Sequence, residues 1–344
     1  MFTATDSATR LARGAPLLVR RARHTASLLP DGDVLIVGGY GDDGVLASAE
    51  VYDPEGATSR ETGRPLAGRA SHVATVLPDG RVLITGGSGS DGSLDSAEVW
   101  DPLTDAFSPA GTMERARVDH SATLLQGGRV LVIGGEQDMG DEPATVELWD
   151  PVTSTFSPAG RLDGRRMGHT ATALPDGQVL IIGGSAVGGY PYPPLSATAL
   201  LWDPVSGEFE PAGDLGIPRW LHVATVLEDG SVLVTGGSHR WDDVREVERW
   251  DPRAQDFTPA GLLAEHRSHH TATRLADDGV LIVGGHRTVE VWKPKATESE
   301  TVGRFRWPRA GHTATSLMDG RVLVTGGSPT TSEDVVRSTW VWNP

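Results

Sequence analysis

The sequence contains no cysteine, and this absence excludes disulfides, thiolate nucleophiles and cysteine-ligated metals. Lysine is scarce as well, because only Lys293 and Lys295 stand among the 30 basic residues, a bias that suggests a GC-rich bacterial genome. No apolar run is long enough to span a bilayer, and residues 1–20 lack the apolar core of a signal peptide. We therefore expect a cytoplasmic protein.

An excess of positive charge is also missing, since the formal net charge is −16 at pH 7. Binding to nucleic acid requires clustered Lys and Arg, and anionic membranes likewise attract basic segments. The charge therefore argues against both kinds of partner. We expect a small-molecule ligand instead, and a monomeric protein. No stretch shows a sustained helical period of apolar residues, so we expect almost no helix.

What the sequence does contain is one unit that occurs seven times. Each copy has an Arg-x-x-His motif, an apolar run ending in Gly-Gly, and an aromatic residue two positions before a proline. The steps between successive histidines are 48, 48, 49, 53, 48 and 42 residues. These histidines are His24, His72, His120, His169, His222, His270 and His312. A period near 50 residues indicates a repeat architecture, in which features shared by all copies are expected to be scaffold.

Within a copy the apolar runs are short, rich in Val, Ile, Leu and Thr, and bounded by Gly, Pro and Asp, which is typical of strands. The Asp79-Gly80 pair between two such runs predicts a hairpin turn, because glycine tolerates the positive φ of that turn. Each copy therefore encodes about four short antiparallel strands, which make one propeller blade. One blade cannot bury both of its faces, but a closed ring of blades can.

The repeat resembles the kelch motif, which is marked by an apolar run, a double glycine and spaced aromatic residues. The double glycines are Gly38-Gly39, Gly86-Gly87, Gly134-Gly135, Gly183-Gly184, Gly236-Gly237, Gly284-Gly285 and Gly326-Gly327. The aromatic residues are Tyr52, Trp100, Trp149, Trp202, Trp250, Trp292 and Trp342. One departure is that the later tryptophan of the kelch motif is replaced by Phe107, Phe156, Phe209 and Phe257.

This resemblance covers essentially the whole chain and implies an all-β, seven-bladed propeller of four-stranded antiparallel blades. We predict a single domain over residues 1–344. The last copy ends after its third strand, so residues 1–20 are expected to supply the outer strand of blade 7. Such closure is common in kelch propellers, and it removes the exposed strand edges of an open ring.

The seven repeated histidines suggest a metal site, but seven equivalent ligands at one radius cannot converge on one ion. We expect the repeated His and Arg to hydrogen-bond neighbouring backbone between blades. Five copies also carry a glutamate two residues before the blade aromatic, and we expect each to pair with a repeat arginine. These glutamates are Glu50, Glu98, Glu147, Glu248 and Glu290; the fourth and seventh copies have Leu200 and Trp340 instead.

Candidate site residues come from the two connections that vary between copies, the loop after Gly-Gly and the loop leading into Arg-x-x-His. In an up-and-down blade both loops emerge on one face, so we place the site there, at the mouth of the central channel. Blades three and six supply the candidate acids and bases. The catalytic candidates are Asp119, Glu136, His269 and His286. The candidate substrate-binding residues are Arg23, Tyr40, Tyr190, Tyr192, Trp220, His239, Trp241 and Trp307.

Our leading hypothesis is a small-molecule site with acid–base chemistry. Carboxylates facing histidines in a partly dry pocket can act as acid and base near neutral pH. This chemistry suits an isomerase, lyase or cyclase of bacterial specialised metabolism that needs no cofactor. Arg23 would hold an anionic group, and the aromatic residues would hold an apolar or aromatic body.

The kelch resemblance also implies other activities. Kelch-like copper oxidases have a cysteine–tyrosine cofactor, which this chain cannot form. Plant specifier proteins bind iron through Glu-x3-Asp-x3-His, a spacing that the sequence lacks. A 2-His-carboxylate site from His269, His286 and Glu136 remains an option, although we expect no metal. Kelch adaptors bind peptides through an arginine-rich mouth, so a protein-binding module is the main alternative, and a glycan-binding surface propeller is a third.

Overall fold

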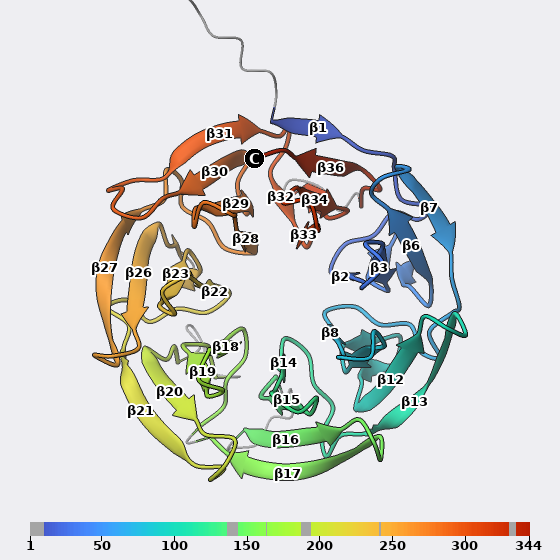
Figure 1. Ribbon diagram of the computed structural model, residues 1–344, viewed down its shortest axis with the longest axis horizontal. Coiled ribbons are helices and arrows are strands. Elements are labelled where there is room, and N and C mark those ends of the chain that lie inside the picture. The colour runs from blue at the N-terminus through green and yellow to red at the C-terminus, as the bar shows by residue number, and fades with distance from the viewer. Residues whose placement is uncertain (1–9, 136–143, 163, 187–193, 241, 330–334) are drawn as a thin grey trace, which may run out of the picture.

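The structure, a computed structural model, is a ring of seven blades around a central channel (Figure 1). It describes residues 10–135, 144–162, 164–186, 194–240, 242–329 and 335–344. Within these ranges every regular element is a strand, which confirms the all-β propeller predicted from the repeat. Over the same ranges no helix has the length and apolar character that crossing a membrane would require.

Each blade is a four-stranded antiparallel sheet whose first strand lines the channel and whose last strand lies on the outer rim (Figure 1). Blades 1 and 2 are β2 (Thr25–Leu28), β3 (Val34–Val37), β6 (Ala49–Asp53), β7 (Thr58–Glu61) and β8 (Val73–Val76), β9 (Val82–Thr85), β12 (Ser96–Asp101), β13 (Ala106–Thr112). Blades 3 and 4 are β14 (Ser121–Leu124), β15 (Val130–Ile133), β16 (Thr145–Asp150), β17 (Thr155–Arg161) and β18 (Thr170–Ala173), β19 (Val179–Ile182), β20 (Thr198–Trp202), β21 (Phe209–Asp214).

The remaining blades repeat this order. Blades 5 and 6 are β22 (Val223–Val226), β23 (Val232–Thr235), β26 (Glu246–Asp251), β27 (Asp256–Leu262) and β28 (His270–Arg274), β29 (Val280–Gly284), β30 (Thr288–Trp292), β31 (Glu300–Arg304). Blade 7 is β33 (Thr313–Ser316), β34 (Val322–Thr325), β36 (Thr339–Trp342) and β1 (Leu11–Arg13). Two-residue strands in the loops are β4 (Tyr40–Gly41), β5 (Gly44–Val45), β10 (Ser88–Gly89), β11 (Gly92–Ser93), β24 (Ser238–His239), β25 (Asp242–Asp243), β32 (Arg309–Ala310) and β35 (Ser328–Pro329).

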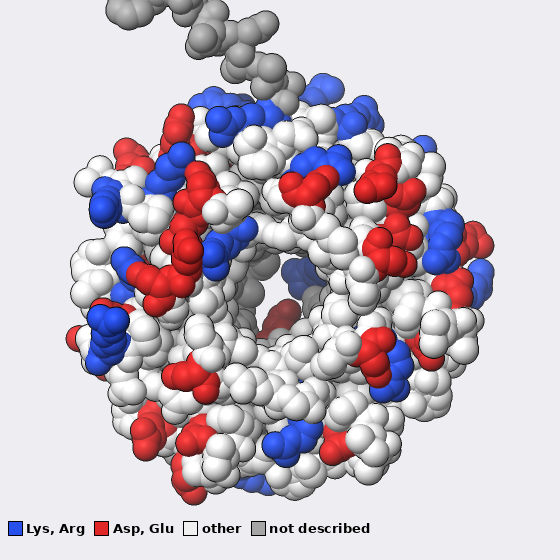
Figure 2. Space-filling view, in the orientation of Figure 1, with Lys and Arg blue, Asp and Glu red and all other residues white. Residues whose placement is uncertain are grey.

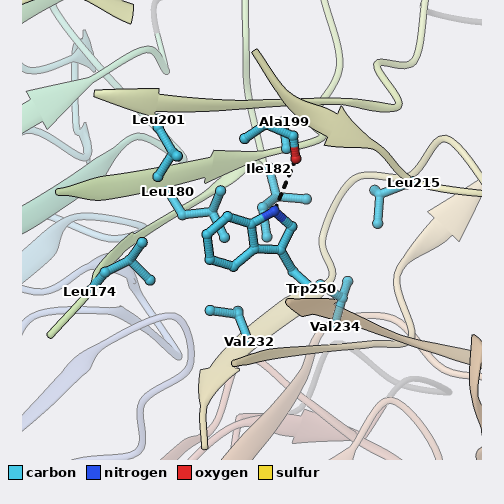
Figure 3. Packing of buried hydrophobic residues seen from close by; sticks show 10 residues of the cluster. Leu174, Leu180, Ile182, Ala199, Leu201, Leu215, Val232, Val234 and Trp250 are labelled. Carbon is cyan, nitrogen blue, oxygen red and sulfur yellow. Dashed lines mark hydrogen bonds between the residues drawn. The ribbon is translucent and has the colours of Figure 1, made fainter. Parts of the chain in front are cut away.

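The hydrophobic core lies between neighbouring blades. The second strand of each blade is fully buried, because it has a blade on either side. Figure 3 shows Trp250 of blade 5 packed against Leu180, Ile182 and Leu201 of blade 4. Its indole N–H donates to the carbonyl of Ala212 at 2.9 Å, so the one polar atom of this ring is satisfied. All six repeat tryptophans are at most 2% exposed.

The ring is closed by the N-terminal segment. β1 pairs antiparallel with β36 in the register Leu11–Trp342 and Arg13–Trp340. The N–H of Leu17 then donates to the carbonyl of Arg337 at 2.8 Å. Blade 7 is thus built from both ends of the described chain, as predicted.

Successive blades are joined by a backbone hydrogen bond that occurs seven times. The N–H of the second glycine in each Gly-Gly donates to the carbonyl of the repeat arginine in the next blade, at 2.8–2.9 Å. The joint between blades 7 and 1 uses the same bond, from Gly327 to Arg21. The first glycine is required because Gly38 has a φ of 62°, and a Cβ there would lie 2.2 Å from the carbonyl oxygen of Arg69.

The guanidinium of each repeat arginine acts within its own blade. Arg21 donates to the carbonyl of Gly38 at 2.6 Å and to the carboxylate of Glu50 at 2.9 Å. The predicted arginine–glutamate pairs are confirmed in blades 1, 2, 3, 5 and 6. The repeat arginine thus bonds the backbone of the neighbouring blade, as expected, but through its carbonyl, while its guanidinium bonds groups of its own blade.

The repeat histidines do connect neighbouring blades, and their Nε2 atoms meet hydroxyl groups there. Nε2 of His72 lies 2.9 Å from Oγ1 of Thr25 in blade 1, and Nε2 of His120 lies 2.8 Å from Thr85 in blade 2. Burial, followed by the charge of the nearby repeat arginine, lowers the pKa of His72 to about 3. The imidazole is therefore neutral, and its ring packs between blades.

Blade 7 replaces its glutamate by Trp340 without leaving its arginine unsupported. The guanidinium of Arg309 lies 4.9 Å from the ring centroid of Phe305, and this ring meets Trp340 edge-on at 5.6 Å. A cation above an aromatic face is stabilised by the ring quadrupole. Burial lowers the pKa of Arg309 to about 10, so the group stays charged at neutral pH. Two aromatic residues thus take the place of the carboxylate.

Removing a repeat glutamate should destabilise the ring strongly. The carboxylate of Glu98 accepts bonds from Arg69 and from the N–H groups of Leu66 and Ala67, and Arg69 is completely buried. We expect Glu98→Ala to lower the free energy of unfolding by about 3–5 kcal/mol, because it leaves a buried charge unpaired. Asp79→Asn, which breaks an exposed pair with Arg81, should cost less than about 1 kcal/mol in the same chemical denaturation experiment. Equal losses would contradict the role given to Glu98.

The buried histidines should make stability depend on pH. Their pKa lies near 3 in the folded protein for His72, His169, His222 and His312, against 6.5 without burial. Below pH 6.5 the unfolded chain therefore binds more protons than the folded one, so stability falls as the pH drops from 6.5 toward 3. Denaturant midpoints measured between pH 8 and pH 4 should show this loss, and His72→Gln should make it shallower. An unchanged slope in the variant would refute the assignment.

Candidate functional site

The third residue of every Arg-x-x-His motif has a left-handed backbone. Its φ lies between 51° and 62° in all seven blades. These residues are Arg23, Ser71, Asp119, Gly168, Leu221, His269 and Gly311. A non-glycine residue adopts this conformation only where its surroundings enforce it, and here the buried Arg and His on either side do so. We call this set the left-handed ring.

Neighbouring members of the left-handed ring are joined by a backbone hydrogen bond at four of the seven joints. The N–H of Ser71 donates to the carbonyl of Arg23 at 2.9 Å, and that of Arg23 donates to the carbonyl of Gly311 at 2.6 Å. Likewise, the N–H of Gly168 donates to the carbonyl of Asp119 at 3.2 Å, and that of Leu221 donates to the carbonyl of Gly168 at 2.8 Å. Because each member lies one or two residues before an inner strand, the ring encircles one end of the channel.

This end of the channel carries the variable loops. The residue before the left-handed position pairs with the residue directly after Gly-Gly, as in Ala22 with Tyr40 and Trp220 with Ser238. The loop into Arg-x-x-His and the loop after Gly-Gly therefore lie on one face, as the alternation of connections predicted.

Three members of the ring carry titratable or charged groups, Arg23 in blade 1, Asp119 in blade 3 and His269 in blade 6. Burial raises the pKa of Asp119, although the charges of Arg23 and His269 both act to lower it. Burial and then Arg23 lower the pKa of His269, while Asp243 and Asp119 act to raise it. The three groups thus influence one another across the channel. Figure 2 shows basic and acidic side chains inside the central opening.

These shifts define what the groups can do. With its pKa below 6.5, His269 is mainly neutral at pH 7 and can accept a proton. The hydroxyl of Ser268 lies 3.1 Å from its Nδ1 and can fix the tautomer. The raised pKa of Asp119 brings that carboxyl closer to the range of a general acid. Arg23 is exposed and donates to the Ser71 hydroxyl at 3.4 Å, which leaves its cationic head accessible to an anion.

Other predicted residues lie close to this end of the channel. Trp220 packs beside the left-handed ring, because a Cβ on Gly168 would meet its Cε3 at 3.3 Å. Tyr40 follows Gly-Gly in blade 1 and is half-buried. His239 is held by a 2.7 Å contact between its Nδ1 and the carbonyl of Pro218.

The structure does not bring all predicted residues together. Nδ1 of His286 lies 3.2 Å from the hydroxyl of Thr288 and 4.0 Å from the carboxylate of Glu265, both in blade 6 or its entry segment. Trp307 is 54% exposed and lies under the guanidinium of Arg306. Four predicted residues lie outside the described residues, namely Glu136, Tyr190, Tyr192 and Trp241. Among the residues that are described, no group of three His, Asp or Glu side chains could hold a metal ion.

Sequence reasoning missed two contributors. Ser71 accepts from Arg23, and Asp243 in β25 favours the charged form of His269. Ser71 occupies the same repeat position as Asp119 and His269, so listing that position in all seven copies would have found it. Asp243 carries no such signal, because its loop differs in length between copies.

Comparison with known proteins identifies the family of the repeat. Residues 69–114, which span the second copy, match the family model of the Kelch motif. Together with the seven blades of this pattern, the match supports a kelch-repeat propeller. No curated protein matches it.

A solved structure shares the fold. A fungal alcohol oxidase of the AA5 family, in complex with copper, superposes with a TM-score of 0.75 at 16% identity, covering 97% of this chain and 75% of that chain. At this identity the likeness shows the fold alone.

The coupling across the left-handed ring can be measured without a ligand. We expect NMR titration to give His269 a pKa below 6.5. Arg23→Gln should raise this pKa because it removes a repelling positive charge, and Asp119→Asn should lower it because it removes an attracting negative charge. Arg60→Gln on the outer rim should leave it unchanged. If neither ring variant moved the titration of His269, the three groups would not share a site.

Proposed function

We propose that this propeller binds a small organic anion at the end of its channel and transfers protons on it, as an isomerase, lyase or cyclase without a cofactor. The observation that carries the proposal is the placement of Arg23, Asp119 and His269 at one repeat position, where the other four blades have Ser, Gly, Leu and Gly. The shared scaffold position gains an acid, a base and a cation only in blades 1, 3 and 6.

In this mechanism Arg23 binds the anionic group of the substrate, and Trp220 contacts its apolar or aromatic body. Neutral His269 accepts a proton from a carbon next to a carbonyl group. Asp119, in its protonated form, donates a proton to the carbonyl oxygen as the enolate develops. Return of a proton to another carbon, or loss of a leaving group, then gives the product.

The protein-binding alternative is less well supported by the structure. A kelch adaptor would use the repeat arginines at its mouth, but these are buried here, each at most 9% exposed, and their guanidinium groups bond carbonyls of their own blade. The net charge of −16 also disfavours an acidic peptide. Capture of one stoichiometric protein partner that Arg23→Gln releases would favour this alternative.

Proton abstraction can be assayed without knowledge of the product. Purified protein is incubated in D2O with small carboxylates and phosphates that carry a carbonyl group, including aryl-substituted 2-oxo acids, and loss of the α-proton signal is followed by NMR. We expect exchange with at least one compound. His269→Gln and Asp119→Asn should each slow it about 100-fold or more, the usual contribution of a general acid or base.

The matched control is Asp42→Asn, which removes an exposed carboxylate on the loop of blade 1. It should exchange at the rate of the unaltered protein. Absence of exchange with every compound would refute the proposed activity, and so would rates in the His269→Gln and Asp119→Asn variants equal to that of the unaltered protein.

A further inference from the structure

Blade 4 departs from the repeat at Leu200, where five other blades have a glutamate. In those blades the carboxylate also accepts an N–H from the segment that enters the blade. Glu50 accepts from Leu18 at 2.7 Å, and Glu248 accepts from Gly216 at 2.7 Å. The glutamate therefore fills the space between the entry segment and the third strand. Leu200 cannot accept these bonds.

A cavity occupies this place in blade 4. It measures about 620 Å³ and lies between residues 164–166, the start of β20 and the end of β21. The same place in blade 1, lined by the equivalent residues Arg21, Glu50 and Glu61, holds only about 60 Å³. Of these two equivalent places, the one in blade 4 has the size of a small-molecule site and the one in blade 1 does not.

A cation lies beside this cavity, and two of its nitrogens have no hydrogen-bond partner among the described residues. Arg165 lines it, and its Nε and Nη2 atoms are buried yet make no hydrogen bond. Burying guanidinium nitrogens without acceptors is costly, and a carboxylate satisfies two of them at once. In blade 1 the equivalent residue is Arg20, which instead reaches the exposed carboxylate of Asp42.

The rest of the lining is mainly apolar. Leu195, Leu200 and Pro211 form apolar walls, and Ser196 and Thr198 add hydroxyl groups. The acidic residue in the described lining is Asp214, whose charge disfavours ligands with several negative charges.

From these observations we infer that the cavity of blade 4 binds a monocarboxylate with a compact apolar body. The ligand carboxylate takes the place of the missing repeat glutamate and accepts from the guanidinium of Arg165. Its apolar body contacts Leu195 and Leu200. This site is separate from the left-handed ring.

Calorimetric titration of the full chain with phenylacetate and hexanoate tests this site, with phenylacetamide and hexanamide as neutral analogues of the same shape. We expect each acid to bind at least about tenfold more tightly than its amide, because the bond to a charged acceptor is lost in the amide. Arg165→Gln should weaken binding of the acid about tenfold or more. Arg20→Gln is the matched control in blade 1 and should leave binding unchanged.

Leu200→Glu is the sharpest variant, because it restores the residue of five other blades. It should abolish binding of both acids while the melting temperature stays the same or rises. The same variant should leave proton exchange at the left-handed ring unchanged, so failure of one proposal does not imply failure of the other.

Three results would overturn the assignment. These are no binding of either acid at millimolar concentration, equal affinity for acid and amide, and retained acid binding in folded Leu200→Glu. If Leu200→Glu failed to fold, the comparison of Arg165→Gln with Arg20→Gln would decide.

Discussion

The ring depends on one arginine in each blade, which bonds both the preceding blade and its own blade. Its carbonyl accepts the glycine N–H of the preceding blade, while its guanidinium holds carbonyls and, in five blades, a carboxylate of its own blade. This arrangement explains much of the repeat. The first glycine of each pair is needed because a Cβ would meet the arginine carbonyl, and the histidine three residues after that arginine packs its ring against the same glycine. A buried charge is costly unless it is paired and bonded, and here every carbonyl that it reaches belongs to the scaffold.

The same constraint creates the site. With Arg and His of the motif fixed by the joint, the residue between them is forced into a left-handed conformation beside the channel. Its backbone belongs to the scaffold, but its side chain makes no contact that the repeat requires. Chemistry can therefore vary at this position while the ring remains intact. Blades 1, 3 and 6 have a cation, an acid and a base there, and the pKa shifts of Asp119 and His269 follow from their burial together.

Sequence reasoning predicted the fold almost completely, because a repeat reveals its period, its core aromatics and the partner of each arginine by comparison of its copies. It also placed Asp119 and His269 at one end of the channel, since equivalent positions of the blades lie at the same level along the channel axis. It could not predict which loop side chains face inward. His286 turns toward Thr288 and Glu265 of its own blade, a choice that depends on local loop geometry. The two breaks in the glutamate pattern look alike in sequence, yet Trp340 joins Phe305 in an aromatic support for Arg309, whereas Leu200 borders a cavity.

The closure of blade 7 has a consequence for how the chain folds. β1 is the first of the described strands to be synthesised, and it pairs with β36, the last one. β1 therefore cannot form its native pairing until β36 has been synthesised. Contacts between residues more than 300 positions apart close only after the intervening loop entropy has been overcome, which makes them slow to form. Until then β36 presents an unpaired strand edge that other chains can occupy. The acidic surface, with its net charge of −16, repels other copies during this interval and favours closure of each ring by its own N-terminal strand.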